Sequence, residues 1–128
     1  MGAIGGLFSG AIAFYVNIEA GYSAALVPAL KQFFYGVFVG GSLVQLSQKI
    51  SISIEQKALA IIIGTIAPVV LTVVLISSIH LFKGTPNPLE TIFFTALPTP
   101  FGFFIIATAR RRKFDRKQRK REEKQQLA

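Results

Sequence analysis

The residue with the clearest potential for chemistry is Lys31, which lies inside the apolar run GYSAALVPALKQFFYGVFVGG, residues 21–41. Lys31 follows Tyr22 by nine residues, about 14 Å along a helix, and this spacing predicts a position near the middle of a bilayer. A central lysine costs roughly 2.5–3.5 kcal/mol on insertion scales, so it usually faces a partner or a wet cavity. Gln32 and Tyr35 supply further polar groups beside it.

Two other interpretations of Lys31 remain open. Pro28 could separate an interfacial or re-entrant piece, residues 22–30, from a shorter span, which would place Lys31 at the membrane surface. Alternatively, Lys31 has a structural partner, either Glu19 or a carbonyl that a proline deprives of its helical donor.

A second feature at the same expected depth is the stretch ALPTPFG, residues 96–102. Pro98 and Pro100 each remove a backbone donor, so the carbonyls of Phe94 and Ala96 lose their helical partners. Broken helices at membrane depth often form transport sites. We therefore expect an unwound turn here.

Together the two features predict one polar site at mid-depth, in which the lysine meets the freed carbonyls and holds a phosphate or carboxylate. The alternative is an ordinary kink, repaired by the hydroxyls of Thr95 and Thr99. The candidate residues are Lys31, Gln32, Tyr35, Phe94, Ala96, Pro98 and Pro100.

Other chemistry has little support in the sequence. The chain contains no cysteine, one histidine and six carboxylates, three of them near the C-terminal end. These residues form no nucleophile–base pair, no paired carboxylates within an apolar segment and no phosphate-binding loop. We therefore expect no enzymatic activity, no metal site and no cofactor.

The elements that must position the candidate residues are apolar segments. With 52% hydrophobic and 16% charged residues, the chain is too apolar for an ordinary soluble domain of 128 residues. Long apolar segments predict helices in a bilayer, because a helix satisfies its own backbone polar groups. The predicted fold class is an all-α integral membrane protein with transmembrane helices at about 2–16, 22–46, 58–82 and 89–109.

The distribution of basic residues predicts the orientation. Ten of the 14 lie between Arg110 and Lys124, and such excess charge marks the cytoplasmic side. Four spans then place both termini inside, with twelve basic residues inside and one, Lys83, outside. The most suitable location is the plasma membrane, with a transmembrane domain at 1–109 and a basic cytoplasmic helix or tail at 110–128.

The basic tail predicts contact with anionic lipid headgroups, at about 1 kcal/mol for each basic residue near the surface. Among aromatic residues only Phe114 interrupts the basic run, and aromatic stacking is a common part of single-strand binding. Nucleic acid is therefore not an expected partner. The expected lipid contacts are Arg110, Arg111, Arg112 and Lys113.

Small residues recur every four positions and predict faces where helices pack closely, because they let backbones approach. Such a face serves either association with another protein or packing within the chain itself. The candidate packing residues are Gly2, Gly6, Gly10, Gly36, Gly40, Ala60 and Gly64.

Two classes of function follow. The first is a small multi-spanning subunit or assembly factor that packs against a larger membrane complex, or against another copy, through its glycine faces. The second is a transport or lipid-handling protein that binds an anionic group at the mid-membrane site, as an oligomer. We expect the first class, because the chain is small and carries little chemistry.

Overall fold

The computed structural model describes residues 2–82 and 84–128, and regular structure in these ranges is entirely helical. Met1 and Lys83, on which the orientation argument draws, lie outside the described residues. Four helical stretches are long and apolar enough to cross a membrane, as predicted. The elements are α1 (Gly2–Asn17), η1 (Ile18–Ala20), α2 (Tyr22–Tyr35), η2 (Gly36–Gly40), α3 (Gly41–Ser53), α4 (Lys57–Leu81), α5 (Pro88–Ala96) and α6 (Thr99–Gln126).

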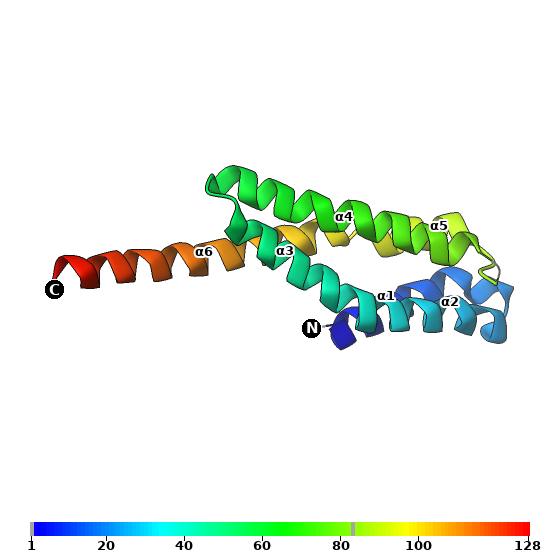
Figure 1. The fold of residues 1–128 in the computed structure, drawn as a ribbon. Coiled ribbons are helices and arrows are strands. Elements are labelled where there is room, and N and C mark those ends of the chain that lie inside the picture. Colours follow the sequence, from blue (N-terminus) through cyan, green and yellow to red (C-terminus); the bar gives the residue numbers. More distant parts are fainter. Residues whose placement is uncertain (1, 83) are drawn as a thin grey trace.

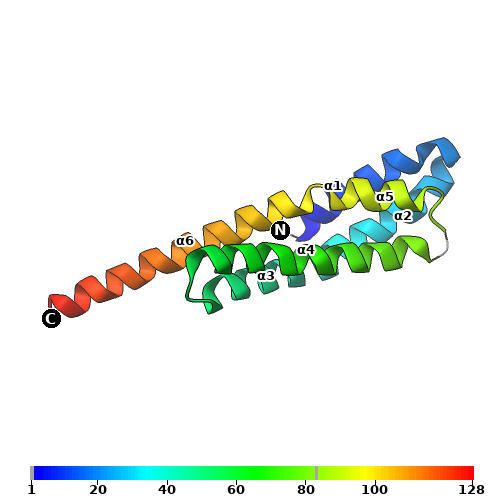
Figure 2. The ribbon, with the colours of Figure 1, turned by 90° about the horizontal axis from the view of Figure 1, so that it is seen from above.

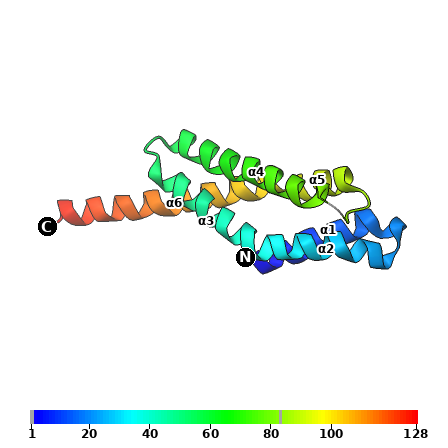
Figure 3. The same ribbon diagram turned by 45° about the vertical axis from the view of Figure 1, so that its right-hand side comes forward.

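The helices lie along one long axis (Figures 1 and 2). One end, the η1 end, carries η1 and the start of α5; the other, the tail end, carries the turn between α3 and α4. Helix α1 packs along α2 and η2 and contacts α5, whereas α3, α4 and α6 pack together. The first residues of α1 lie near the middle of the axis (Figure 3). Helix α4 runs through both halves of the bundle, because it also contacts α5 and α2, and the other helices of the two halves differ.

Many buried positions are small or polar, and most large apolar side chains face outward, apart from a small buried cluster around Ile76 and Phe103. Ala13, Ala25, Ala60 and Ala107 are fully buried, while Phe38 is 70% exposed. In hydrocarbon, burying a leucine gains little, so helices associate through close packing and hydrogen bonds. The buried polar residues are Asn17, Gln32, Ser47, Ser51, Thr72, His80, Thr91, Thr95 and Arg111.

The closest helix contact joins α1 to the start of η2. A Cβ added to Gly36 would lie 2.7 Å from the Gly6 nitrogen, and one added to Gly6 would lie 2.7 Å from the Phe33 oxygen. Gly2 and Gly10 approach the same helix, and Gly64 packs against α3 and α6. Gly40 differs, because no atom lies within 4 Å of its Cβ position.

A π-helical turn, Gly36–Gly40, interrupts the second long helix and has no counterpart in the sequence prediction. Its wider turn changes the direction in which the following residues point. Before it, α2 packs on α1; after it, α3 packs on α4 and α6. The π turn thus lets one continuous helix change partners halfway along its length.

The fourth predicted span is two helices, but the expected unwound turn between them is wrong. Only Leu97 and Pro98 separate α5 from α6, and both retain right-handed helical backbone angles. The Leu97 nitrogen donates to the Phe93 oxygen at 2.9 Å, and the Thr99 hydroxyl donates to the Ala96 oxygen at 2.7 Å. The threonine therefore compensates one carbonyl that Pro100 leaves without its donor.

The second span continues as helix to Ser53, seven residues beyond its predicted end, and a buried arginine closes it. The Arg111 guanidinium donates to the backbone oxygens of Ser51 (3.3 Å), Ile54 and Glu55 (2.6 Å). Its Nε lies 2.9 Å from Asp115. Arg111 was predicted to contact lipid headgroups; that is wrong, since only 7% of it is exposed and it binds carbonyls in and just after the last turn of α3.

This contact predicts different effects for two adjacent arginines. Arg111→Ala leaves buried carbonyls without a charged donor, at a cost of roughly 1.5–3 kcal/mol, so the thermal midpoint in detergent should fall by several degrees. Arg112→Ala removes an exposed side chain and should leave the midpoint unchanged. Equal midpoints for the two variants would show that the Arg111 contact does not hold α3 against α6.

Candidate functional site

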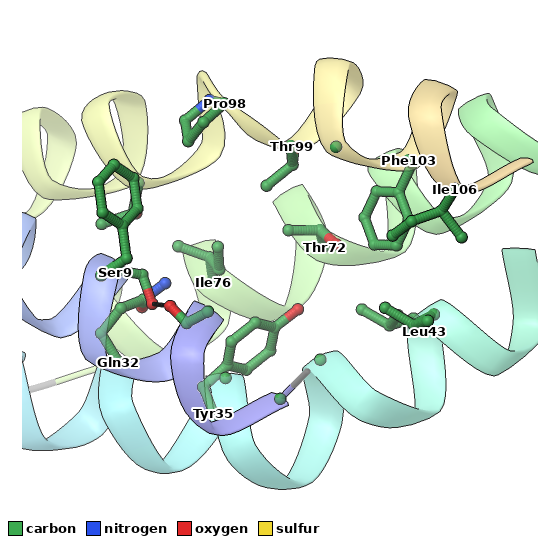
Figure 4. Close-up of a pocket in the computed structure, with 18 residues that line it drawn as sticks. Ser9, Gln32, Tyr35, Leu43, Thr72, Ile76, Pro98, Thr99, Phe103 and Ile106 are labelled. Carbon is green, nitrogen blue, oxygen red and sulfur yellow. Dashed lines mark hydrogen bonds between the residues drawn. The ribbon is translucent and has the colours of Figure 1, made fainter. Parts of the chain in front are cut away.

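A cavity of about 320 Å³ lies where the helices separate around the π turn. Helix α4 lines one wall of the cavity. The adjoining walls are formed by η2 with α3 and by the junction of α5 with α6, and α1 covers one end (Figure 4). The lining is mostly apolar. It comprises Gly2, Gly5, Phe8, Ser9, Gln32, Tyr35, Gly36, Gly40, Leu43, Val44, Thr72, Ile76, Thr95, Pro98, Thr99, Gly102, Phe103 and Ile106.

Two hydroxyl groups in this cavity have no hydrogen-bond partner beyond each other among the described residues. Tyr35 is 7% exposed and Thr72 is 3% exposed; the two hydroxyls interact with each other, but neither meets a donor or acceptor in full hydrogen-bond geometry. Both point into the space between the helices (Figure 4). Leaving a buried hydroxyl unsatisfied costs about 1–3 kcal/mol, so this pair indicates that the cavity receives a polar group.

The other polar side chains of the lining are already engaged. Ser9 donates to the Gly5 oxygen at 2.8 Å, and Thr95 donates to the Thr91 oxygen at 2.5 Å. The Gln32 side-chain oxygen lies 2.9 Å from His80 Nε2. The chemistry available to an occupant is therefore that of Tyr35 and Thr72.

A buried polar cluster closes the η1 end above the cavity. Because the Gln32 oxygen can only accept, His80 donates through Nε2, and its Nδ1 accepts from the Thr85 hydroxyl at 3.1 Å. His80 is buried, with 1% of its surface exposed. This cluster fixes α2 against α4.

A parallel cluster joins α1 to α5 at the same end. The Asn17 amide donates to the Thr91 hydroxyl at 2.7 Å, and its oxygen accepts from the Asn87 backbone nitrogen at 2.9 Å. Asn17 is fully buried. Polar bonds of this kind hold helices together in hydrocarbon, where apolar burial contributes little.

The backbone oxygens that the Lys31 ammonium contacts at the end of α4 were not among its predicted partners, the carbonyls of Phe94 and Ala96. The Lys31 Nζ donates to the oxygens of Ile79 at 3.4 Å and Phe82 at 3.3 Å. These carbonyls belong to the last turn of α4 and the residue after it, where the helix dipole favours a cation. Lys31 thus lies at the η1 end, because its long side chain reaches toward that end of the bundle.

The predicted site residues are only partly brought together. Gln32, Tyr35 and Pro98 line the cavity, whereas Lys31, Phe94, Ala96 and Pro100 are absent from its lining. Sequence reasoning missed Thr72. A usable signal existed: the predicted pair Ala60 and Gly64 continues at the same spacing of four through the buried residues Pro68, Thr72, Ile76 and His80.

Comparison with protein-family models, curated proteins and solved structures finds no match to this chain. Among the described residues, no three His, Cys, Asp or Glu side chains gather where they could hold a metal ion. A function can therefore be inferred only from the fold and the cavity.

The position of Lys31 predicts a structural effect when its charge is removed. Lys31→Met loses the cation that binds the end of α4, worth about 0.3–2 kcal/mol, so the thermal midpoint should fall while bound lipid is retained. Lys31→Arg should keep most of the stability, and Lys49→Met is an exposed control. A selective loss of anionic lipid in Lys31→Met, with stability unchanged, would restore the original anion-site hypothesis.

Proposed function

We propose that this chain is a small membrane-spanning protein that binds a lipid in its intramembrane cavity. The observation that carries the proposal is the pair of buried hydroxyls, Tyr35 and Thr72, which among the described residues interact only with each other and not in full hydrogen-bond geometry. A cavity of about 320 Å³ falls at the lower end of the range of small-molecule sites, roughly 300–1,000 Å³. This is lipid handling by binding rather than catalysis, and it does not use Lys31 as an anion site.

The proposed orientation places the η1 end of the bundle outside and the C-terminal part of α6 in the cytoplasm of a plasma-membrane protein. Its support is the basic C-terminal part of α6, which projects alone beyond the bundle (Figure 1). Arg110, Arg112 and Lys113 are exposed where this part begins. They are suited to contact anionic headgroups.

The orientation can be tested with single cysteines, because the chain has none of its own. Glu19 and Gln118 are exposed and lie at opposite ends of the bundle. A membrane-impermeant thiol reagent added to intact cells should label Glu19→Cys and spare Gln118→Cys until the membrane is opened. Labelling of both from outside would refute the proposed orientation.

A second candidate function is a subunit that packs against another membrane protein. It is favoured by Gly40 and Gly41, which are adjacent and have no atom within 4 Å of either Cβ position. Gly5 and Gly102 are similarly open, but they line the cavity as Gly40 does, whereas Gly41 does not. An open glycine outside the cavity, such as Gly41, would let the backbone of a partner helix approach closely.

Gly40 and Gly41 form a matched pair for testing the proposed function. Only Gly40 lines the cavity, so Gly40→Leu should fill it and lower the lipid retained after mild-detergent purification by several-fold. Gly41→Leu should retain lipid as the parent does. The measurement is mass spectrometry of the extracted lipid, normalised to protein.

The same purification separates the two candidates. Equal lipid retention in parent, Gly40→Leu and Gly41→Leu would refute lipid binding in the cavity. Loss of a co-purifying protein from both variants, with lipid retention equal throughout, would establish the subunit function instead.

A further inference from the structure

We propose that the ligand is a neutral lipid that lies wholly within the membrane, with a ring-sized, carbonyl-bearing head in the cavity and an apolar tail between α1 and α5. This inference rests on the proposed function and assigns its ligand class. It follows from the depth of the two hydroxyls, the charge of the lining and a groove that adjoins the cavity.

The depth of Thr72 excludes the ester group of a phospholipid. Thr72 precedes Leu81, the end of α4, by nine residues, which is about 14 Å along the helix. The hydrocarbon core is about 30 Å thick, so Thr72 lies close to its midplane. Phospholipid carbonyls stay at the edge of this core, and an acyl tail alone would leave both hydroxyls unsatisfied. The oxygen must therefore belong to a molecule that can sit at mid-depth.

The charge around the cavity excludes an anionic head. Among the described lining residues none is Lys, Arg, His, Asp or Glu. A carboxylate or phosphate here would be an uncompensated charge in hydrocarbon, which is costly. Uncharged carbonyl oxygens suit the site instead, because Tyr35 and Thr72 can each donate one hydrogen bond.

An adjoining groove provides a place for the tail. This groove, of about 1,060 Å³, runs between α1 and α5 and shares Phe8 and Pro98 with the cavity. Its other end carries Glu19 and Glu90, whose carboxylates would repel an anionic headgroup. A tail can therefore extend from the cavity toward the η1 end. The apolar groove residues are Phe8, Ala11, Ile12, Val16, Ile18, Phe94, Leu97, Pro98 and Phe101.

The test uses a 1,4-benzoquinone with a ten-carbon alkyl chain as the probe, and decylbenzene, which has no oxygen, for comparison. Binding to the purified full chain is measured by equilibrium dialysis in detergent. The quinone should bind saturably, about tenfold more weakly to Tyr35→Phe and to Thr72→Val. The control Tyr15→Phe removes a hydroxyl from the groove and should not change its binding. Decylbenzene should bind weakly and respond to none of these substitutions.

Other outcomes overturn the inference. Phosphatidylglycerol that binds as well as the quinone, with the same dependence on Tyr35, would show that the site takes an anionic lipid. A second contrary outcome concerns the ligand-free protein. If Tyr35→Phe and Thr72→Val each lower its thermal midpoint, and the double variant lowers it no further, the two hydroxyls bond each other. Absence of saturable quinone binding, while Gly40→Leu still loses lipid, would overturn the ligand class and leave the proposed function standing.

Discussion

The structure depends on the close approach of two glycines, Gly6 of α1 and Gly36 at the start of the π turn. No side chain fits between these backbones, so α1 is held against the second long helix at this level. The π turn begins at the same residue and directs α3 away from α1 toward α4 and α6. The cavity lies where the helices part. Its position is therefore a consequence of this contact and of the helix irregularity that follows it.

Side-chain hydrogen bonds join neighbouring helices at both ends of the bundle, and the cavity lies between these two ends. At the tail end Arg111 binds the carbonyls that end α3, and at the η1 end Asn17, His80 and Lys31 bind neighbouring helices. In hydrocarbon no water is present to satisfy a leftover polar group. The hydroxyls of Tyr35, Thr72 and Thr108 lack a partner in full hydrogen-bond geometry among the described residues, and those of Tyr35 and Thr72 line the cavity, which is why these two indicate an occupant.

Much of the fold could be predicted from the sequence. Apolar segments separated by short polar connections indicated the spanning helices, because backbone hydrogen bonding leaves few alternatives in a bilayer. The stripe beginning at Ala60 and Gly64 was visible and continues at the same spacing to Thr72 and His80, but hydropathy did not mark these two residues as buried. In a helix that is apolar all round, hydropathy does not distinguish the buried face from the lipid-facing one.

The remaining features depend on tertiary contacts that no local pattern encodes. The segment GVFVG gives no sign of a π turn, and Arg111 looks like its exposed neighbours until α3 is placed beside it. For Lys31, counting residues from Tyr22 gave a mid-membrane depth. That count omitted the reach of the side chain and the level at which α4 ends, and both place its ammonium at the η1 end.

The central claim is that a lipid, and not the bulk bilayer, occupies the cavity and its groove. Photocrosslinking from Phe8 tests it most directly, because Phe8 lines both, and a benzoylphenylalanine there preserves an aromatic side chain. Phe38, 70% exposed and outside both linings, is the matched control. In native membranes the account predicts one adduct of defined, phosphorus-free mass at position 8 and a mixture of phospholipid adducts at position 38. The same phospholipid mixture at both positions would contradict it.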